Sequence, residues 1–263
     1  FQPVPLTQAL DEIAAKLGAT LAAHGPEAIA GYKGGGAFFT SSSLRMLNEF
    51  LAAAGSPKAF SSVTIDQSAK AVAAGRIGIW PAGRDPFGRG EVFMIVGANP
   101  LVSVSMNGFD TRNPLKRLKQ AKARGMKLIV IDPRRTETAR FADAFLQPLP
   151  GEDCAILAGL IHIILAEGWQ DHEFCARYAG DLDVLRAALA PFTPAYVARR
   201  ADVPEADLRR VAEVFARDSR RGAASSATGP DMSPGSNLAE HLIECLNVIC
   251  GRFVREGETV PHP

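Results

Sequence analysis

Two aspartates and two arginines follow short apolar segments in the middle of the chain, where strands are expected to end. Asp132 directly follows "KLIVI" and precedes Pro133, Arg134 and Arg135, and Asp153 follows "PLPGE". A carboxylate at the end of a second β-strand can accept hydrogen bonds from both ribose hydroxyls. A fixed carboxylate can also pair with two adjacent N–H donors, which is the edge that guanine presents. Arginine adds forked donors that suit a phosphate or a planar base, so these residues suggest nucleotide binding.

Glycine-rich or polar turns follow the other apolar segments of this region. Val92–Val96 runs into Gly97-Ala98-Asn99-Pro100, "AFLQPL" into Pro150-Gly151-Glu152-Asp153, and "GAASSA" into Thr228-Gly229-Pro230. Because ligands of open α/β sheets bind outside the carboxyl ends of the strands, four such ends would form one polar shelf. Gly97 and Gly151 would let backbone N–H groups approach a ligand closely. Asp153 would begin a buried helix, whose dipole favours a carboxylate there.

Each of these features also has a simpler explanation. Asp-Pro is a common turn, Asp153 could act only as a helix N-cap, and Arg134 and Arg135 could form a solvated edge. The ordered set is more specific than any single member. A dinucleotide fingerprint is missing, since Gly97 does not begin a G-x-G-x-x-G motif, and this argues against a standard NAD domain.

The elements that must position these residues alternate along the chain. Short apolar strands are predicted at 28–32, 76–80, 92–96, 127–131, 144–149 and 222–227, and "VTI" at 63–65 is predicted as a strand end that leads into a helix. Helices are predicted from a Thr7 cap to about residue 24, and at 43–54, 67–74, 114–124, 155–167 and 237–250, with short helices through 171–216. This alternation predicts an α/β fold: a mainly parallel sheet with helices on both faces, Rossmann-like but without the glycine fingerprint.

Composition and charge limit the possible functions. The 263 residues are 47% hydrophobic and 22% charged, with a formal net charge of +1, so nothing points to nucleic acid or to an anionic membrane surface. No apolar run is long enough for a membrane-spanning helix. The four cysteines are scattered without a CxxC pair, which makes zinc or iron–sulfur ligation a weak hypothesis. We expect the chain to be a piece of a longer protein, because Phe1 is not a natural start, and no compartment can be assigned.

A break in the helical pattern near residues 55–65 suggests two domains. Gly55, Pro57, Ser61 and Ser62 interrupt the pattern there. We expect residues 1–62 to form a partial α/β lobe, the first half of a discontinuous domain, and residues 63–263 to form an α/β cofactor-binding domain.

Three segments, taken together, resemble one enzyme family. They are "IVGANPLVS", "KLIVIDPRRTETARFADAFLQPLPGED" and "GLIHIILAEGWQDHEFCARYAGDLDVLR", and "SATGPDMSPGSNLAEHLIECLNVICGR" extends the likeness downstream. In order and spacing they are similar to the molybdopterin oxidoreductases of the dimethyl sulfoxide reductase and formate dehydrogenase superfamily. The resemblance covers almost the whole chain.

The resemblance implies a bis(molybdopterin guanine dinucleotide) cofactor that carries molybdenum or tungsten. By motif position, Gly97, Ala98, Asn99 and Pro100 would contact its phosphate and ribose side. Asp132, Arg134 and Arg135 would hold the guanosine, with Gly151 beside it, and Asp153 would bind the guanine edge. Thr228 and Gly229 would lie near the pterin.

The resemblance also implies a metal ligand before a helix upstream of the Asn-Pro strand. The matching residue is Asp66, just after "SVTI", with Ser68 as a lesser candidate. A carboxylate is a competent hard ligand for high-valent molybdenum. Asp66 could instead be the N-cap of the helix at 67–74.

Two features of the family are missing from this sequence. The usual cysteine cluster for a [4Fe–4S] centre and a later β-rich domain are absent, and we expect both in the remainder of the parent chain. The hypothesis is therefore a cofactor-binding segment of an enzyme that performs two-electron redox chemistry on a small substrate and passes electrons to an electron-transfer subunit. The alternatives are a non-catalytic nucleotide-binding or scaffold subunit and, less favoured, an NAD-type domain.

Overall fold

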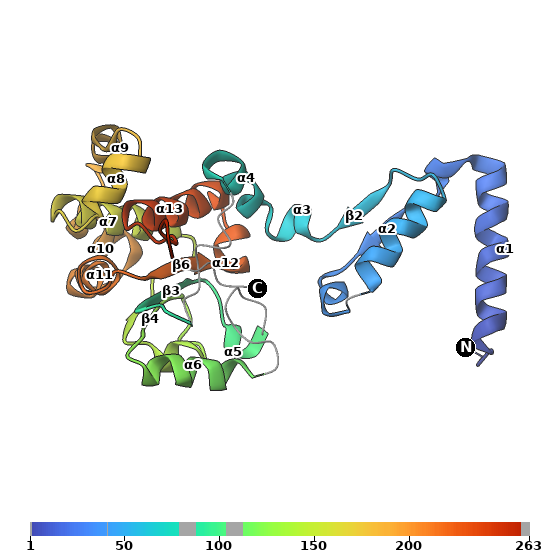
Figure 1. The fold of residues 1–263 in the computed structure, drawn as a ribbon, viewed down its shortest axis with the longest axis horizontal. Coiled ribbons are helices and arrows are strands. Elements are labelled where there is room, and N and C mark those ends of the chain that lie inside the picture. Colours follow the sequence, from blue (N-terminus) through green and yellow to red (C-terminus); the bar gives the residue numbers. More distant parts are fainter. Residues whose placement is uncertain (1, 41, 79–87, 104–112, 259–263) are drawn as a thin grey trace. The chain divides into compact units, whose positions relative to one another are not determined.

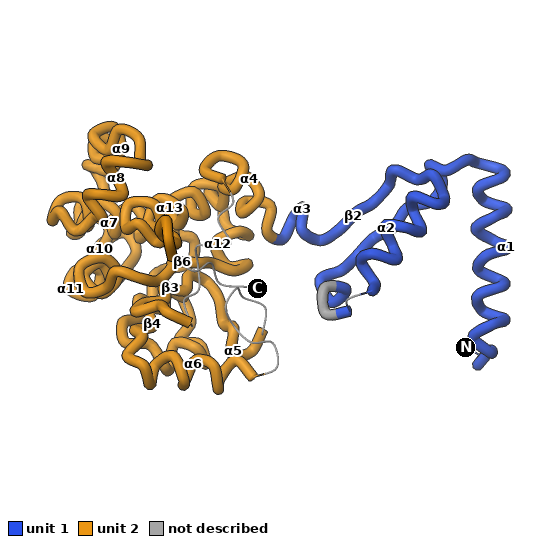
Figure 2. The backbone as a smooth tube through the Cα atoms, viewed as in Figure 1, with its two compact units in different colours: residues 1–66 blue, residues 67–263 orange. Residues whose placement is uncertain are grey.

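The computed structural model describes residues 2–40, 42–78, 88–103 and 113–258 (Figure 1). The chain divides into two compact units, Phe1–Asp66 and Gln67–Pro263 (Figure 2). Among the described residues, no helix is both long and apolar enough to cross a membrane. The division lies close to the predicted boundary, while the assignment of residues 1–62 to a discontinuous domain stays a prediction.

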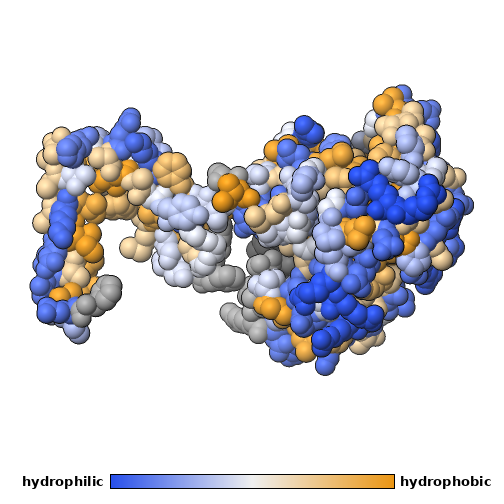
Figure 3. All heavy atoms as spheres, turned by 180° about the vertical axis from the view of Figure 1, so that it is seen from behind, coloured by the Kyte–Doolittle hydropathy of each residue, from blue (hydrophilic) through white to orange (hydrophobic). Residues whose placement is uncertain are grey.

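The first unit pairs two short parallel strands with helices. Its strands β1 and β2 run in parallel, with Gly31 opposite Ala59. In chain order, its elements are α1 (Leu6–His24), η1 (Pro26–Ala28), β1 (Gly31–Lys33), η2 (Gly35–Phe39), α2 (Ser43–Ala53), β2 (Ala59–Ser61) and α3 (Val63–Asp66). Helix α1 buries none of its residues, and apolar side chains lie along one side of it at the surface (Figure 3).

Three predictions for local structure in residues 1–78 are wrong. Pro5, not Thr7, is the N-cap of α1. "VTI" is helical in α3, because three β-branched residues without a strand beside them cannot gain from ladder pairing. Arg76 and Ile77 continue the alanine-rich α4 (Ser68–Ile77), which ends at Gly78 with a φ of 103°; the rest of the strand predicted at 76–80 lies outside the described residues.

The second unit is built on a four-stranded parallel sheet in the order β5-β4-β3-β6. The strands are β3 (Val92–Val96), β4 (Lys127–Ile131), β5 (Ala144–Leu146) and β6 (Gly222–Ser226). The helices are α4, α5 (Pro100–Ser103), α6 (Pro114–Ala123), η4 (Ala139–Phe141), α7 (Asp153–Ala166), α8 (His172–Tyr178), α9 (Leu182–Leu189), α10 (Pro194–Ala201), α11 (Glu205–Ala212), the π-helical η5 (Glu213–Arg217), α12 (Thr228–Asp231) and α13 (Ser236–Ile249).

Both faces of this sheet are covered, as predicted. Alternate residues of β3 enter different cores: Met94 packs in the cluster that includes α7, α11 and α13, whereas Phe93 packs with α6. Helix α7 is apolar on almost all sides, as its burial requires, and Ile156, for example, has no exposed surface. Asn247 pairs with both backbone groups of Ala224 and so satisfies the outer edge of β6. The α/β fold class is confirmed.

Candidate functional site

The four strands of the second unit end side by side at one edge of the sheet. The last residue pairs are Leu146 with Ile131, Ile131 with Val96, and Val96 with Ser226. Backbone pairing continues one residue further, where the Gly97 N–H donates to Ile131 at 2.8 Å and the Asp132 N–H donates to Leu146 at 3.1 Å. We call this edge, with the turns that follow it, the shelf. It brings together the strand ends that carry every predicted cofactor-binding residue.

The order of the strands creates a switch point at the shelf. From β3 the chain proceeds to β4 and β5 on one side, whereas β6 lies on the other side of β3. Such a reversal opens a crevice between the two strand ends, which is where open α/β sheets bind ligands. Gly97 follows β3 and the Thr228-Gly229 turn follows β6, so both line the switch point. The helices that follow the two turns lie on opposite faces of the sheet: α5 follows Gly97, and α13 follows the Thr228-Gly229 turn (Figure 1).

Gly97 and Gly229 allow the two turns to touch. Gly97 has a φ of 59°, and a Cβ atom there would lie 2.4 Å from Cδ of Pro230. The Gly229 N–H donates to the Gly97 carbonyl at 3.2 Å. A side chain at either position would push the turns apart.

The Asn99 side chain is engaged within the protein. Its Oδ1 accepts hydrogen bonds from the backbone N–H of Thr138 at 3.1 Å and from the Thr138 hydroxyl at 2.8 Å. Its Nδ2 donates to Glu137 at 2.6 Å. Asn99 therefore ties the β3 turn to the segment after β4, while Ala98 and Pro100 are buried beneath it.

Asp132 is held in a fixed orientation beside β5. Its Oδ1 accepts the backbone N–H of Arg134 at 2.8 Å, and the residue is only 9% exposed. Burial raises the pKa of this carboxyl, although the Arg134 N–H and guanidinium oppose that shift. One carboxylate oxygen is thereby positioned while the other remains available to a ligand.

Asp153 is the first residue of α7 and lies close to Asp132. Burial raises the pKa of the Asp153 carboxyl first, and repulsion from Asp132 and Glu152 raises it further. The N-cap residue is Glu152, without a side-chain capping bond, so the explanation of Asp153 as the N-cap is wrong. The charge of Asp132 at the end of β4 thus opposes ionisation of Asp153 at the start of α7, and a donor-rich ligand between the two carboxyl groups would offset that opposition.

The remaining predicted residues of the shelf are exposed. The Arg134 side chain is 63% exposed and lies 3.5 Å from Glu137, while the Arg135 guanidinium lies over the Phe145 ring at 5.7 Å. Gly151 has a φ of 89° with open space where a Cβ would be. The guanidinium groups of Arg134 and Arg135 are accessible from solvent.

The predicted metal ligands lie at the junction of α3 and α4. Asp66 is the last residue of α3, and Gln67 is the N-cap of α4, which rules out the explanation of Asp66 as the cap. The Asp66 Oδ1 atom is buried and has no hydrogen-bond partner in the described part of the chain. Ser68 is exposed at the start of α4. No group of three or more His, Cys, Asp or Glu residues within the described ranges could hold a metal ion.

A buried ion-pair network lies next to the Thr228-Gly229 turn, and the sequence analysis missed it. Lys70 of α4 forms ion pairs with Asp231 and with Glu240, the latter at 3.3 Å, and donates to the Ala227 carbonyl at 3.3 Å. Glu240 also accepts the hydroxyl hydrogen of Ser226. The signal in the sequence was Glu240 itself, a charged residue within the apolar stripe of the helix at 237–250. The network fastens α4 to the end of β6.

Replacing Lys70 with methionine is expected to destabilise the protein by about 3–5 kcal/mol, because two buried carboxylates would lose their cation. Burial raises the pKa of Glu240, and Lys70 opposes that shift. In Lys70→Met the opposition is gone, so the deficit should shrink as the pH falls and Glu240 takes up a proton. Urea unfolding at several pH values tests this.

The matched control for Lys70 is Lys122→Met. Lys122 pairs with Asp143 at 2.6 Å, but both side chains are about one quarter exposed. Its loss should cost less than about 1 kcal/mol. Equal effects of the two variants would contradict the role given to the network.

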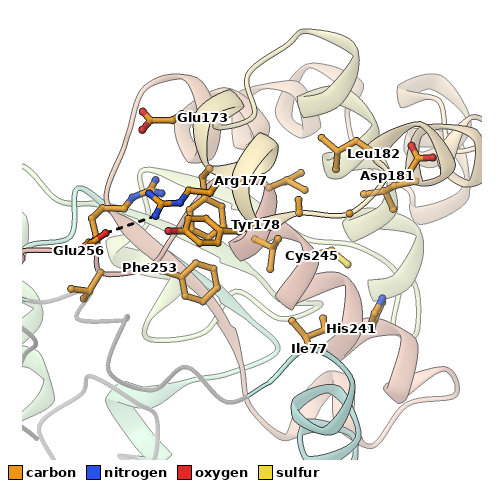
Figure 4. A pocket seen from close by; sticks show the side chains of 18 residues that line it. Ile77, Glu173, Arg177, Tyr178, Asp181, Leu182, His241, Cys245, Phe253 and Glu256 are labelled. Carbon is orange, nitrogen blue, oxygen red and sulfur yellow. Dashed lines mark ion pairs between the residues drawn. The ribbon is translucent and has the colours of Figure 1, made fainter.

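A cavity of about 890 Å³ lies among α8, α9, α13 and the residues after α13 (Figure 4). Arg177 and Glu256 form an ion pair at 3.8 Å at its rim. Burial raises the pKa of Cys245 in its wall to about 11 and lowers the pKa of His241. The thiol is therefore protonated at neutral pH and is a poor nucleophile. None of the predicted site residues lines this cavity, so the shelf remains the candidate site.

Comparison with known proteins finds one family model that matches most of the chain. Residues 1–243 match the family model described as molybdopterin oxidoreductase. The molybdopterin-containing subunit of thiosulfate reductase from Salmonella typhimurium is 30% identical over 260 residues, which cover 98% of this chain and 32% of that protein. Acetylene hydratase from Syntrophotalea acetylenica is 28% identical over 267 residues, covering 100% of this chain and 35% of that protein.

A solved structure shows the same fold. The structure of acetylene hydratase from Pelobacter acetylenicus superimposes with a TM-score of 0.77 at 27% identity and covers 100% of this chain and 35% of the other. The chain thus spans about a third of the length of these relatives.

Proposed function

Because this chain belongs to the molybdopterin oxidoreductase family, we propose that its shelf binds the guanosine end of a bis(molybdopterin guanine dinucleotide) cofactor that carries molybdenum or tungsten. The observation that carries the proposal is the pair Asp132 and Asp153. Asp132 is 9% exposed at the end of β4, Asp153 is half-buried at the start of α7, and the charge of Asp132 raises the pKa of Asp153. A ligand with several N–H and O–H donors would relieve that repulsion.

The donors and acceptors of the shelf fit guanosine. Asp153 would accept the two adjacent N–H groups of the guanine edge, as a fixed carboxylate at a helix start can. Asp132, with one oxygen held by Arg134, would accept the ribose hydroxyls with the other. Arg134 and Arg135 are exposed and would reach the base or a phosphate.

Glycine-containing turns would face the cofactor at the shelf. Gly97, Ala98, Asn99 and Pro100 form the turn at the switch point, where the backbone would approach the phosphate and ribose side. The Thr228-Gly229 turn, which contacts Gly97, would lie near the pterin. Gly151 has open space beside its Cα atom and would allow the guanosine to lie against the backbone.

For the parent protein we propose two-electron redox chemistry on a small substrate. The metal of such a cofactor, when bound, exchanges electrons with the substrate, while the protein supplies orientation and electrostatics. The residues of this chain would bind and orient the nucleotide end. An electron-transfer subunit and a [4Fe–4S] centre carried outside this sequence would complete the electron path.

Asp66 is the proposed metal ligand. Its unpartnered Oδ1 atom supports this assignment, since a hard carboxylate oxygen suits high-valent molybdenum. Asp66→Ala is expected to remove one oxygen neighbour of the metal, as measured by X-ray absorption, and to leave the guanosine content within about twofold of wild type. An unchanged metal environment in Asp66→Ala and a changed one in Ser68→Ala would transfer the assignment to Ser68.

The decisive test is elemental and chemical analysis of the full-length protein, expressed with sufficient cofactor supply. We expect stoichiometric molybdenum or tungsten and the release of GMP on acid hydrolysis. GMP without metal would favour a nucleotide-binding subunit that does no redox chemistry. Absence of both would refute the cofactor proposal and favour the scaffold alternative.

A further inference from the structure

Arg252 is a buried cation that Glu91 and Asp171 attract from nearby, but neither carboxylate lies within ion-pair distance in the described part of the chain. The residue follows α13 and is 2% exposed, and Nε and Nη1 of its guanidinium are buried without a hydrogen-bond partner. Its Nη2 donates to the carbonyls of Phe215 and Ser219 and to the Ser219 hydroxyl, and the group lies 4.8 Å from the Phe215 ring centre. Burial lowers the pKa of Arg252. Among the described residues it forms no ion pair, which is unusual because an unpaired buried charge is costly.

Other arginines gather around Arg252. It lines a pocket of about 230 Å³ together with four more arginines, namely Arg89, Arg220, Arg221 and Arg255. They come from three separate parts of the sequence: the segment before β3, the segment before β6, and the segment after α13. Local sequence therefore does not account for this concentration of positive charge.

The carboxylates near this pocket are already engaged by other groups. Asp171 pairs with Arg255 at 2.5 Å, and Glu258 pairs with Arg221 at 2.6 Å. Glu91 accepts the backbone N–H groups of Arg220 and Arg221 at 2.6 and 3.2 Å. The side chains of Arg252 and Arg220 are left without a carboxylate partner in the described ranges, so the pocket keeps an excess of positive charge.

We propose that this pocket binds a tetrahedral oxyanion, a phosphate or sulfate group, either free or as part of a small metabolite. Guanidinium forks donate in pairs to such oxygens, and an anion here would supply the missing partner for the Arg252 Nε and Nη1 donors. The volume suits a small anion better than a whole dinucleotide.

This site is distinct from the proposed cofactor site. Glu91 and Gly222 mark the amino ends of β3 and β6, whereas the shelf lies at their carboxyl ends. With five residues per strand, the two edges are about 16 Å apart. Failure of one proposal therefore leaves the other standing.

The test is calorimetric titration of the full-length protein with inorganic phosphate and, separately, with sulfate at constant ionic strength. We expect saturable binding of at least one of them with a Kd of about 1 mM or tighter. Arg220→Met should weaken that binding at least tenfold without affecting the fold, because its side chain is exposed and forms no ion pair with the residues that the structure describes. Arg199→Met, which removes an exposed arginine of α10, is the control and should bind within about twofold of wild type.

A second variant examines the buried cation directly. Arg252→Met should remove the rise in Tm that phosphate or sulfate gives the wild-type protein by binding linkage. No saturable binding of either anion by the wild-type protein would overturn the proposal. So would an Arg220→Met variant that binds as tightly as Arg199→Met.

Discussion

Replacing Asp153 with asparagine is expected to release the cofactor while leaving the cofactor-free protein at least as stable at pH 7. Loss of a charged acceptor for two N–H donors should cost about 3–4 kcal/mol of binding, or roughly 100- to 1000-fold in Kd. The GMP content of purified protein, measured after acid hydrolysis, reports that loss.

The stability part of this prediction follows from the sign of the pKa shift. Because the folded state raises the pKa of Asp153 above 3.8, the folded protein holds this proton more tightly than the unfolded chain does. Ionising Asp153 therefore costs stability at neutral pH. The cost is complete above the raised pKa and disappears as the pH falls below 3.8. Asparagine removes this cost of ionisation. It also removes the favourable interaction of the Asp153 carboxylate with the helix dipole, which is worth about 0.3–1 kcal/mol.

Urea unfolding of the cofactor-free protein from pH 7 down to pH 4 measures this balance. The Asp153→Asn variant should lose any advantage over wild type as the pH falls. Glu152→Gln is the matched control, since Glu152 pairs with Arg200 at 2.5 Å and should not be required for GMP retention. An Asp153→Asn protein that keeps its GMP but is markedly destabilised would show that Asp153 only supports the helix.

The second large effect is expected for Gly97→Ala. The new Cβ would lie 2.4 Å from Cδ of Pro230 and 3.1 Å from Cα of Gly229, at a φ of 59°. Left-handed backbone costs alanine roughly 1–2 kcal/mol, and overpacking adds about 1–3 kcal/mol. The free energy of unfolding should therefore fall by about 2–5 kcal/mol, and the displaced Thr228-Gly229 turn should lower cofactor retention.

The Gly125→Ala variant separates the cost of left-handed backbone from the cost of overpacking. Gly125 has a φ of 97° but no neighbour within 4 Å of a new Cβ, so only the backbone cost of roughly 1–2 kcal/mol applies. Denaturant midpoints of both variants, together with their GMP content, test the difference. Equal destabilisation would mean that the close approach of the two turns does not constrain Gly97.

The sheet was predictable because its strands are buried on both faces. "VFMIV" is apolar at every position and "KLIVI" at every position after Lys127, which is typical of a covered parallel strand, and both were located correctly. "VTI" and the Arg76-Ile77 pair were also predicted as strand, but they belong to no described sheet and form helix instead. β-propensity thus predicted a strand only where tertiary pairing also existed.

By itself, the sequence determined the α/β class, the strand ends that carry Asp132, Gly97 and Thr228, and the resemblance to the molybdopterin oxidoreductases. These are properties of residue order and local patterning. Only the tertiary structure decided that β6 lies beside β3, which creates the switch point, and that the charge of Asp132 raises the pKa of Asp153. It alone brought Lys70 to Glu240 and five arginines around one pocket. Such contacts join residues as many as 170 positions apart, and no local pattern encodes them because they depend on how the helices pack on the sheet.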